Sequence, residues 1–568
     1  MKPLSLGGFN FLCLKKTFKN LLSNPWVFFC YAWALTFVVY LPAAKAGFVG
    51  DFYKDWLTVI QQQPFWDYIN RPGTATLYQF TQFITYVIYN IIGASRLGWH
   101  FVHVTMHVTT ALLLFVFVKK LLEHIQISFA RGIAFAVSTL FLISPYNSEV
   151  VVHEPCLHYT FGFCLLLLPL IWVQQFLVSG NKKYLLWCSL LYLPATFSLE
   201  IFYLTPVLCG LLWWWYYRYT PYVQKFRIVL FWCLFPMLAS FLLHMILVRF
   251  IISSALPHQV SSSLPSLLSA YSDKALKYLF HIIALGRFWP VAEKQLVYNW
   301  LGKTNVVVVF HVALAIYLFL ATFRRKVASC FRIIAFLLPI IFLLLAIVSP
   351  RQFPDLGWVV FDRYLYFALP FVYLVIALAI TTKKSYRWSL VFFFAFSMIN
   401  LWLLWKVNTR WKESNNLVQH LLESFPVDDS KVTLLLNLPE NYDGIQMIGS
   451  NRTSAMKTAY NAKHDKKIQG NVYDIASFNM NTMKDGAHVK VVNDSMLHVT
   501  MNQWGTWWWF YYIGASSFEN EWYKLDLKDP GHWYELTLKM PQHHYQLLFV
   551  NEQNWRTVDM NKKDSDQY

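Results

Sequence analysis

The sequence predicts a polytopic α-helical membrane protein that ends in a β domain. Of its 568 residues, 57% are hydrophobic and only 14% are charged, whereas soluble proteins carry about 25% charge. Apolar runs long enough to cross a bilayer recur as far as residue 405. From residue 431 onward the hydrophobic period changes to two, which is typical of strands.

Eleven apolar segments are predicted to span the membrane. They are 26–44, 98–120, 131–146, 156–178, 184–198, 200–217, 227–252, 305–323, 331–349, 364–381 and 387–405. Every second connection between them is basic, as the positive-inside rule describes for cytoplasmic loops. This placement explains the net charge of +18 without a nucleic-acid partner. The spans 184–198 and 200–217 are short and closely joined. If they formed one re-entrant unit, every later connection would lie on the opposite side of the membrane, and the later basic clusters argue against that.

The alternation of charge sets the domain organisation. Residues 1–25 face the cytoplasm, and 26–405 form the membrane module with external loops 45–97 and 253–304. The odd span count places the tail on the same non-cytoplasmic side, with 406–430 as a helical connector and 431–568 as an antiparallel β domain, a sandwich in the simplest reading. Within the first loop, 74–93 is apolar on a helical period and is expected to lie in the membrane interface, although a full span is the alternative.

Two acids and a set of arginines stand where the chain leaves the hydrocarbon. Asp51 and Asp55 follow the first span, either as solvated acids at a helix end or as chemical groups at the membrane surface. The cations on the predicted external side are Arg71, Arg287, Arg351 and Arg363. Arginine offers a phosphate a two-pronged match, but arginine near a span end also snorkels toward water.

Further ionisable residues are placed at or inside the predicted spans. His100, His103 and His107 share one helix face and are predicted to line a polar cavity, with a metal site as the minor alternative. Cavity-lining roles are also predicted for Glu149, Glu154, His158, Glu200 and Tyr364. Glu200 can equally cap the helix that follows it. All eight cysteines lie at or before Cys330, and no zinc-type cysteine spacing is present.

Five motifs carry a resemblance to a known family. INRPGTATLYQF, GWHFVHVTMHVTTALLLF, SPYNSEVV, SLEIFYLTP and FDRYLYFALP follow one another in this order. Over about residues 25–405 the chain resembles the membrane half of the TMTC-like glycosyltransferases, which belong to the GT-C class together with the protein O-mannosyltransferases. The family usually has two adjacent acids in the first loop, whereas Asp51 is followed here by Phe52.

The resemblance implies a membrane glycosyltransferase with a GT-C-like fold. The donor would be a polyprenyl-phosphate sugar, the acceptor a hydroxyl on a protein, glycan or lipid, and the reaction inverting. Phosphate leaves without a proton donor, but the acceptor hydroxyl needs a base. By the family position that base is Asp51, with Asp55 as its neighbour, while Arg363 is the main phosphate contact and Arg287 and Arg71 are weaker candidates.

Two other functions stay open on the sequence. A transporter or flippase for a lipid-linked glycan would use similar groups, although no internal repeat is visible. A non-enzymatic scaffold that displays the β domain would leave the acids and arginines unexplained. No cofactor is expected, a divalent metal is the less favoured alternative, and the expected location is a bacterial inner membrane with the tail outside the cytoplasm.

Overall fold

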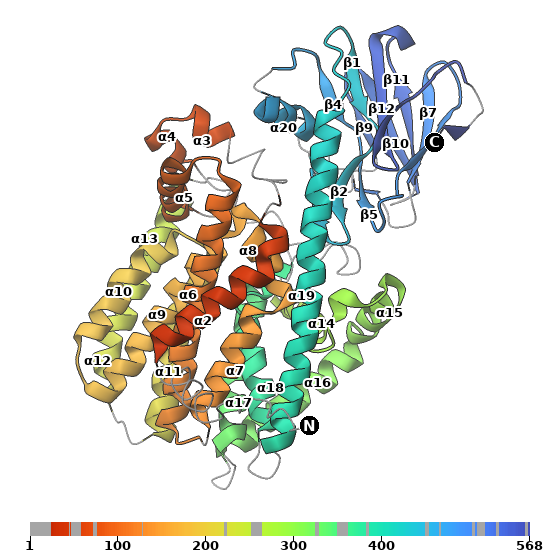
Figure 1. The fold of residues 1–568 in the computed structure, drawn as a ribbon. Coiled ribbons are helices and arrows are strands. Elements are labelled where there is room, and N and C mark those ends of the chain that lie inside the picture. Colours follow the sequence, from red (N-terminus) through yellow and green to blue (C-terminus); the bar gives the residue numbers. More distant parts are fainter. Residues whose placement is uncertain are drawn as a thin grey trace, which may run out of the picture.

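The structure is a computed structural model. It describes residues 24–44, 46, 58–71, 77–127, 129–220, 224–251, 264–323, 329–348, 362–381, 386–448, 454–464, 467–501, 506–507, 517–529, 533–562 and 566–567. Asp51, Asp55 and Arg351 lie outside these residues. The described chain is a helical bundle followed by a β-rich region, which confirms the predicted fold class (Figure 1).

Each of the eleven predicted spans contains a helix. These helices are α2 (Pro25–Tyr40), α6 (Arg96–His124), α7 (Ala130–Leu142), α9 (Leu157–Ser179), α10 (Lys183–Thr196), α11 (Thr205–Tyr219), α13 (Phe235–Ile251), α16 (Thr304–Phe323), α17 (Ser329–Val348), α18 (Leu369–Ile380) and α19 (Tyr386–Glu423). Among the described residues, seven helices are long and apolar enough to cross a membrane, or eight if one bent pair is a single span. With 14, 15 and 12 residues, α10, α11 and α18 are shorter than the roughly 20 residues that a span needs. The count of eleven therefore stays a prediction.

Short helical elements fill the connections. They are η1 (Leu41–Ala43), α3 (Thr58–Gln62), α4 (Phe65–Ile69), α5 (Gln79–Ile92), η3 (Pro145–Asn147), α8 (Ser148–Val152), η4 (Glu154–Cys156), η5 (Glu200–Leu204), α12 (Phe226–Val229), η6 (Leu230–Leu234), α14 (Leu264–Ile283), η7 (Gly286–Phe288), α15 (Val291–Leu301) and η8 (Asp362–Leu365). Figure 1 shows α3, α4 and α5 at the same end of the bundle as the β-rich region. Helix α5 is held there because Thr81 Oγ1 donates to the Ser198 carbonyl over 3.0 Å.

The connection between α7 and α9 is the main departure from the expected loops. The chain bends by 51° between α7 and the helical turns that begin at Pro145, because a proline has no N–H to continue the preceding helix. Instead of an exposed loop, every residue from Ser144 to Leu157 is buried. This α8 segment (residues 144–157) forms part of the inside of the bundle.

Helix α19 is one continuous helix of 38 residues, so the predicted last span and the predicted connector are a single element. It runs along the bundle and reaches the β-rich region (Figure 1). Asn400, Leu404, Asn408 and Trp411 are buried at helical spacing and face the bundle. Asn408 donates to the Val39 carbonyl over 3.0 Å, so a polar side chain ties α19 to the end of α2.

The β-rich region contains three sheets rather than one antiparallel sandwich. Its strands are β1 (Val432–Leu435), β2 (Leu438–Tyr442), β3 (Ile445–Gln446), β4 (Val472–Asp474), β5 (Ser477–Met480), β6 (Ala487–Val491), β7 (Met496–Met501), β8 (Thr506–Trp507), β9 (Ser517–Glu519), β10 (Tyr523–Asp529), β11 (Trp533–Leu538), β12 (Tyr545–Asn551), β13 (Asn554–Thr557) and β14 (Asp566–Gln567). The sheet orders are β13-β12-β1-β4, β14-β6-β7-β11-β10-β9 and β3-β2-β5-β8.

The expectation of purely antiparallel pairing is wrong for three strand pairs. Strand β1 pairs in parallel with β12 and β4, and β2 pairs in parallel with β5. Parallel neighbours need a long connection, and helix α20 (Ala455–His464) lies in the connection that leads to β4. The six-stranded sheet has only antiparallel pairs among its described strands, as the alternating sequence indicated.

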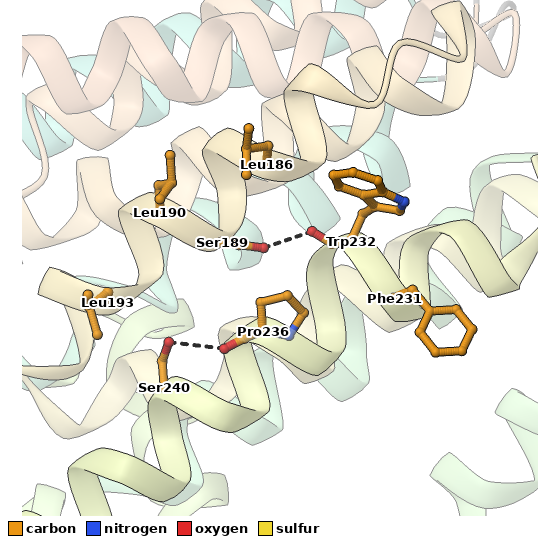
Figure 2. A pocket seen from close by; sticks show the side chains of 8 residues that line it. All are labelled: Leu186, Ser189, Leu190, Leu193, Phe231, Trp232, Pro236 and Ser240. Atoms are coloured by element: carbon orange, nitrogen blue, oxygen red, sulfur yellow. Dashed lines mark hydrogen bonds between the residues drawn. The ribbon is translucent and has the colours of Figure 1, made fainter.

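An apolar groove lies on the bundle between α10 and the η6–α13 segment (Figure 2). Its volume is about 650 Å³, and its lining residues are Leu186, Ser189, Leu190, Leu193, Phe231, Trp232, Pro236 and Ser240. Pro236 has no N–H to give to the Trp232 carbonyl, and Ser189 Oγ donates to that carbonyl over 2.8 Å instead. Because no lining residue is charged, the groove fits lipid contact better than chemistry.

Candidate functional site

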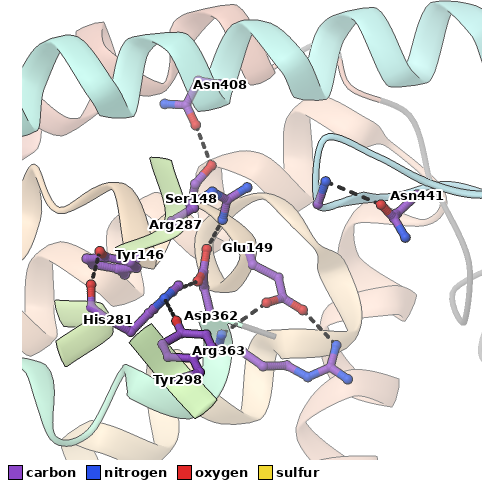
Figure 3. Close-up of polar contacts among 11 residues, drawn as sticks. Tyr146, Ser148, Glu149, His281, Arg287, Tyr298, Asp362, Arg363, Asn408 and Asn441 are labelled. Atoms are coloured by element: carbon purple, nitrogen blue, oxygen red, sulfur yellow. Dashed lines mark hydrogen bonds and ion pairs between the residues drawn. The ribbon is translucent and has the colours of Figure 1, made fainter. Parts of the chain in front are cut away.

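The α8 segment carries a buried ion pair that links two parts of the chain far apart in sequence. Arg363, in η8, donates from Nη1 to Glu149 Oε1 over 2.8 Å and from its backbone N–H to Oε2 over 3.0 Å. The side chains of Arg363 and Glu149 are only 18% and 11% exposed. The two-point contact fixes the carboxylate orientation, as Figure 3 shows.

A second buried network adjoins this pair. Asp362, the residue before Arg363, is fully buried and forms an ion pair with Arg287 of η7. Asp362 Oδ1 also lies 3.4 Å from His281 Nε2 in α14, and His281 Nδ1 lies 2.8 Å from the Tyr298 hydroxyl of α15. Figure 3 shows these side chains converging on Asp362 beside the Glu149 carboxylate.

Charge in this network is concentrated on Asp362 and Arg287. Burial holds the pKa of His281 well below its usual 6.5, and the nearby Lys294 and Arg287 lower it further. A neutral His281 can donate from Nε2 to Asp362 and accept from the Tyr298 hydroxyl at Nδ1. Asp362 is therefore a carboxylate held by one arginine and oriented by one neutral imidazole.

A polar pocket opens next to Arg287, between the bundle and the β-rich region. It has a volume of about 210 Å³, and its lining residues are Arg287, Phe288, Trp289, Pro290, Lys406, Val407, Arg410 and Asp443. Three cations therefore face one acid. We call this space the interface pocket.

The β2–β3 turn supplies the wall of the interface pocket opposite the bundle. Asp443 and Gly444 have positive φ angles of 50° and 77°, which is the backbone that a two-residue Asp-Gly hairpin turn requires. A Cβ on Gly444 would lie 3.6 Å from Arg287 Nη2, so the turn is in close contact with the arginine. Asp443 Oδ2 lies 3.4 Å from Arg410 Nε, which joins the turn to α19.

Lys294, in α15, is a buried lysine whose charge is unfavourable at neutral pH. It is 3% exposed, and burial lowers its pKa from 10.5 to about 8, with Arg287 lowering it further and Asp443 opposing. Below pH 8 both the folded and unfolded chains carry this proton, so the cost of burying the charge is fully present. Between pH 8 and 10.5 the folded chain loses the proton first, and this contribution to stability rises with pH.

Lys294→Met should therefore stabilise the chain most below pH 8, and the gain should shrink toward pH 10.5. The measurement is the unfolding midpoint of wild type and variant in detergent across this range. The exposed Lys412→Met, on α19, is the control and should show no such trend. A constant gain at every pH would show that Lys294 does not titrate as described.

The three predicted histidines lie buried along α6, near the α8 segment and near Tyr366, which follows η8. His103 Nδ1 lies 3.0 Å from the Val150 carbonyl, and His107 Nδ1 lies 2.8 Å from the Tyr366 hydroxyl. His100 is 8% exposed. Of the three, His103 contacts the α8 segment, and the Nε2 atoms of all three histidines are buried without a hydrogen-bond partner.

The other predicted site residues are distributed over two regions. Glu154 and Tyr364 are buried in or near the α8 segment and η8, and His158 is half-buried at the start of α9. Glu200 accepts from the Tyr78 hydroxyl over 2.9 Å. The Arg71 carbonyl accepts from Gln82 of α5 over 3.1 Å, so Arg71 belongs with the α3–α5 layer rather than with the interface pocket.

Several residues of the site were not singled out from the sequence. They are Tyr146, His281, Lys294, Tyr298, Asp362, Lys406, Arg410 and Asp443. Asp362 could have been recognised from the sequence, because an acid at the start of a span, next to Arg363, is costly unless it is paired. In the sequence, Lys406 and Arg410 look like solvated charges of the helical connector. Their proximity to Asp443 becomes visible only in the fold.

Comparison with known proteins gives matches among solved structures but not among family models or curated proteins. No family model matches the chain, and no curated protein matches it. Among solved structures, the chain is similar to ArnT from Cupriavidus metallidurans bound to undecaprenyl phosphate, at 13% identity and a TM-score of 0.33, covering 80% of this chain and 90% of that one. The apo state of ArnT is similar at 12% identity and a TM-score of 0.30, covering 79% and 89%.

Proposed function

We propose that the protein is a membrane glycosyltransferase of the GT-C type that moves a sugar from a polyprenyl-phosphate donor to a hydroxyl acceptor. The observation that carries the proposal is the interface pocket. Three cations face it at the end of an apolar bundle, beside two buried acid–arginine pairs. An apolar carrier with an anionic head needs this combination of a lipid-contacting bundle and a cationic pocket.

The residues divide into phosphate contacts and positioning groups. Arg287, Lys406 and Arg410 are the proposed phosphate contacts, because they line the pocket together. Asp362 positions Arg287 through their buried ion pair, and Glu149 holds the neighbouring Arg363 in a second ion pair. In this proposal the main role of Arg363 is its ion pair with Glu149 rather than a direct contact with the phosphate. Arg71 does not bind the phosphate.

The assignment of the base that activates the acceptor hydroxyl comes from the sequence alone. Asp51 is the proposed base for the acceptor hydroxyl, with Asp55 as its neighbour, and both precede the described α3 in the first external loop. Because phosphate is a good leaving group, the donor side needs charge stabilisation rather than a proton donor. The pocket cations supply that charge.

Donor binding provides the sharpest test of the pocket. Lys406→Gln should weaken binding of a labelled polyprenyl-phosphate sugar by roughly tenfold to a hundredfold, the value of a charge-assisted hydrogen bond. Lys412→Gln, an exposed lysine of the same helix, is the matched control and should bind as wild type does. Equal donor affinity in the two variants would remove Lys406 from the site. Tight binding without turnover in wild type would favour a flippase, and no binding at all would leave the scaffold function.

The β-rich region is proposed to lie outside the cytoplasm, at the same membrane face as the first loop. A reporter that is active only in the cytoplasm, fused after Tyr568, should stay silent, while the same reporter fused before Pro25 should be active. The odd number of predicted spans and the basic connections require this result. An active reporter at the C-terminus would overturn the sidedness of the interface pocket.

A further inference from the structure

Three side chains with metal-binding atoms meet in the α8 segment. The ligand atoms of Glu149, His153 and Cys156 all lie within 4.8 Å of one another, and all three residues are buried. His153 Nδ1 and Cys156 Sγ are 3.8 Å apart. These separations are close to those between two ligands of the same metal ion, which each lie about 2.0–2.3 Å from the metal.

The local backbone explains why three residues so close in sequence can converge. The His153 N–H donates to the Glu149 carbonyl over 2.9 Å, which places the two side chains one turn apart on the same side of α8. At His153 the backbone becomes extended, with φ −88° and ψ 111°, and α8 ends. The chain then turns through η4, where the Cys156 N–H donates to the His153 carbonyl over 2.9 Å and brings Cys156 back to the histidine.

We propose that Glu149, His153 and Cys156 form a binding site for a zinc ion. A thiolate, an imidazole and a carboxylate are the three ligand types that zinc accepts, whereas magnesium and calcium avoid sulfur. Three protein ligands leave the fourth tetrahedral position for water or another small ligand. This assignment goes beyond the proposed transferase activity and does not depend on it.

The surroundings of the three ligands suit a bound dication. Arg363 holds both oxygens of Glu149, and hydrogen bonds of this kind fix ligating carboxylates in known sites. The ring of Trp411 packs against His153 with the ring centroids 6.2 Å apart, which limits the rotation of the imidazole. Zinc binding releases the Cys156 thiol proton, so one thiolate and one carboxylate face the dication and Arg363, and one net positive charge remains.

The experiment uses the full-length chain purified from cells grown in zinc-replete or in cobalt-supplemented, zinc-poor medium. Metal analysis should find about one zinc per chain in the first preparation. The cobalt-loaded chain should show a thiolate-to-cobalt charge-transfer absorption band together with the intense visible bands of a tetrahedral site. Wild-type protein that contains no stoichiometric zinc, and shows no thiolate–cobalt band, overturns the proposal without any variant.

Variants assign the ligands. Cys156→Ser should abolish the thiolate–cobalt band, whereas Cys164→Ser, a half-buried cysteine of α9, should keep it. Loss of a hydrogen-bond partner of a zinc ligand typically weakens metal affinity by roughly 10–100-fold. His153→Gln removes a ligand itself and should weaken zinc affinity at least as much. A band that survives in Cys156→Ser, or that disappears only in Cys164→Ser, places the metal elsewhere. If Cys156→Ser does not fold, protection of Cys156 from alkylation by bound zinc in the wild-type chain decides the question, and equal labelling with and without zinc counts against the site.

Discussion

Asp51→Asn should lower the rate of sugar transfer by roughly 10²–10⁴-fold, the usual contribution of a general base. Asparagine keeps the size of the side chain and most of its hydrogen bonding but cannot accept the acceptor proton. Donor binding should be largely kept, because the phosphate contacts are proposed to lie in the interface pocket. The measurements are transfer from a labelled polyprenyl-phosphate sugar and donor binding by each purified variant.

Asp55→Asn is the matched comparison for this prediction. It makes the same chemical change four residues along the chain and should cost less, since Asp55 lies off the family position. Full activity in Asp51→Asn beside an inactive Asp55→Asn would move the base by one helical turn. Full activity in both variants would mean that these acids are merely solvated at the end of a helix.

Asp362→Asn should lower the free energy of unfolding by about 3–5 kcal/mol, the cost of leaving a buried charge without its partner. Asp362 is fully buried and Arg287 is 8% exposed at its side chain, so water screens the remaining arginine poorly. Asparagine keeps the Oδ1 acceptor for His281 Nε2, and the loss therefore reports on the Arg287 pair. The measurement is the unfolding midpoint in mixed micelles with increasing denaturing detergent.

Two further variants separate the ion pair from general damage to the fold. Asp428→Asn makes the same change at a carboxylate whose Lys431 contact is 3.6 Å long and partly exposed, and should cost at most about 1 kcal/mol. Arg287→Met combined with Asp362→Asn removes both charges and should recover much of the stability lost in Asp362→Asn alone. If the double variant were less stable than Asp362→Asn, the pair would not be the source of the effect.

The sequence located only part of the candidate site, and it did not show how the residues it located contact one another. Glu149 was placed in the short loop 145–155 and Arg363 at the start of a span, and the fold brings them into contact over 2.8 Å. The resemblance assigned Arg363 to a phosphate, and this assignment stays a prediction. The contact with Glu149 was not predicted, because the two residues lie 214 positions apart and no local pattern reveals such a pair. The sequence showed no zinc-type cysteine spacing, and the proposed site has only one cysteine, because its other two proposed ligands are a carboxylate and an imidazole.

The sequence by itself determined the helices of the eleven apolar segments, the amphipathic α5 and the change to strands after residue 431, because hydrophobic periodicity is a local property of the chain. Only the tertiary structure decided that the 145–155 connection is buried, that β1 pairs in parallel with β12, and that the Asp443 turn forms a wall of the interface pocket. Each of these depends on contacts between segments far apart in sequence. In the sequence, a polar or charged side chain that is solvated cannot be distinguished from one that is paired with a distant residue. Whether burial of that side chain lowers or raises the stability of the fold depends on this partner.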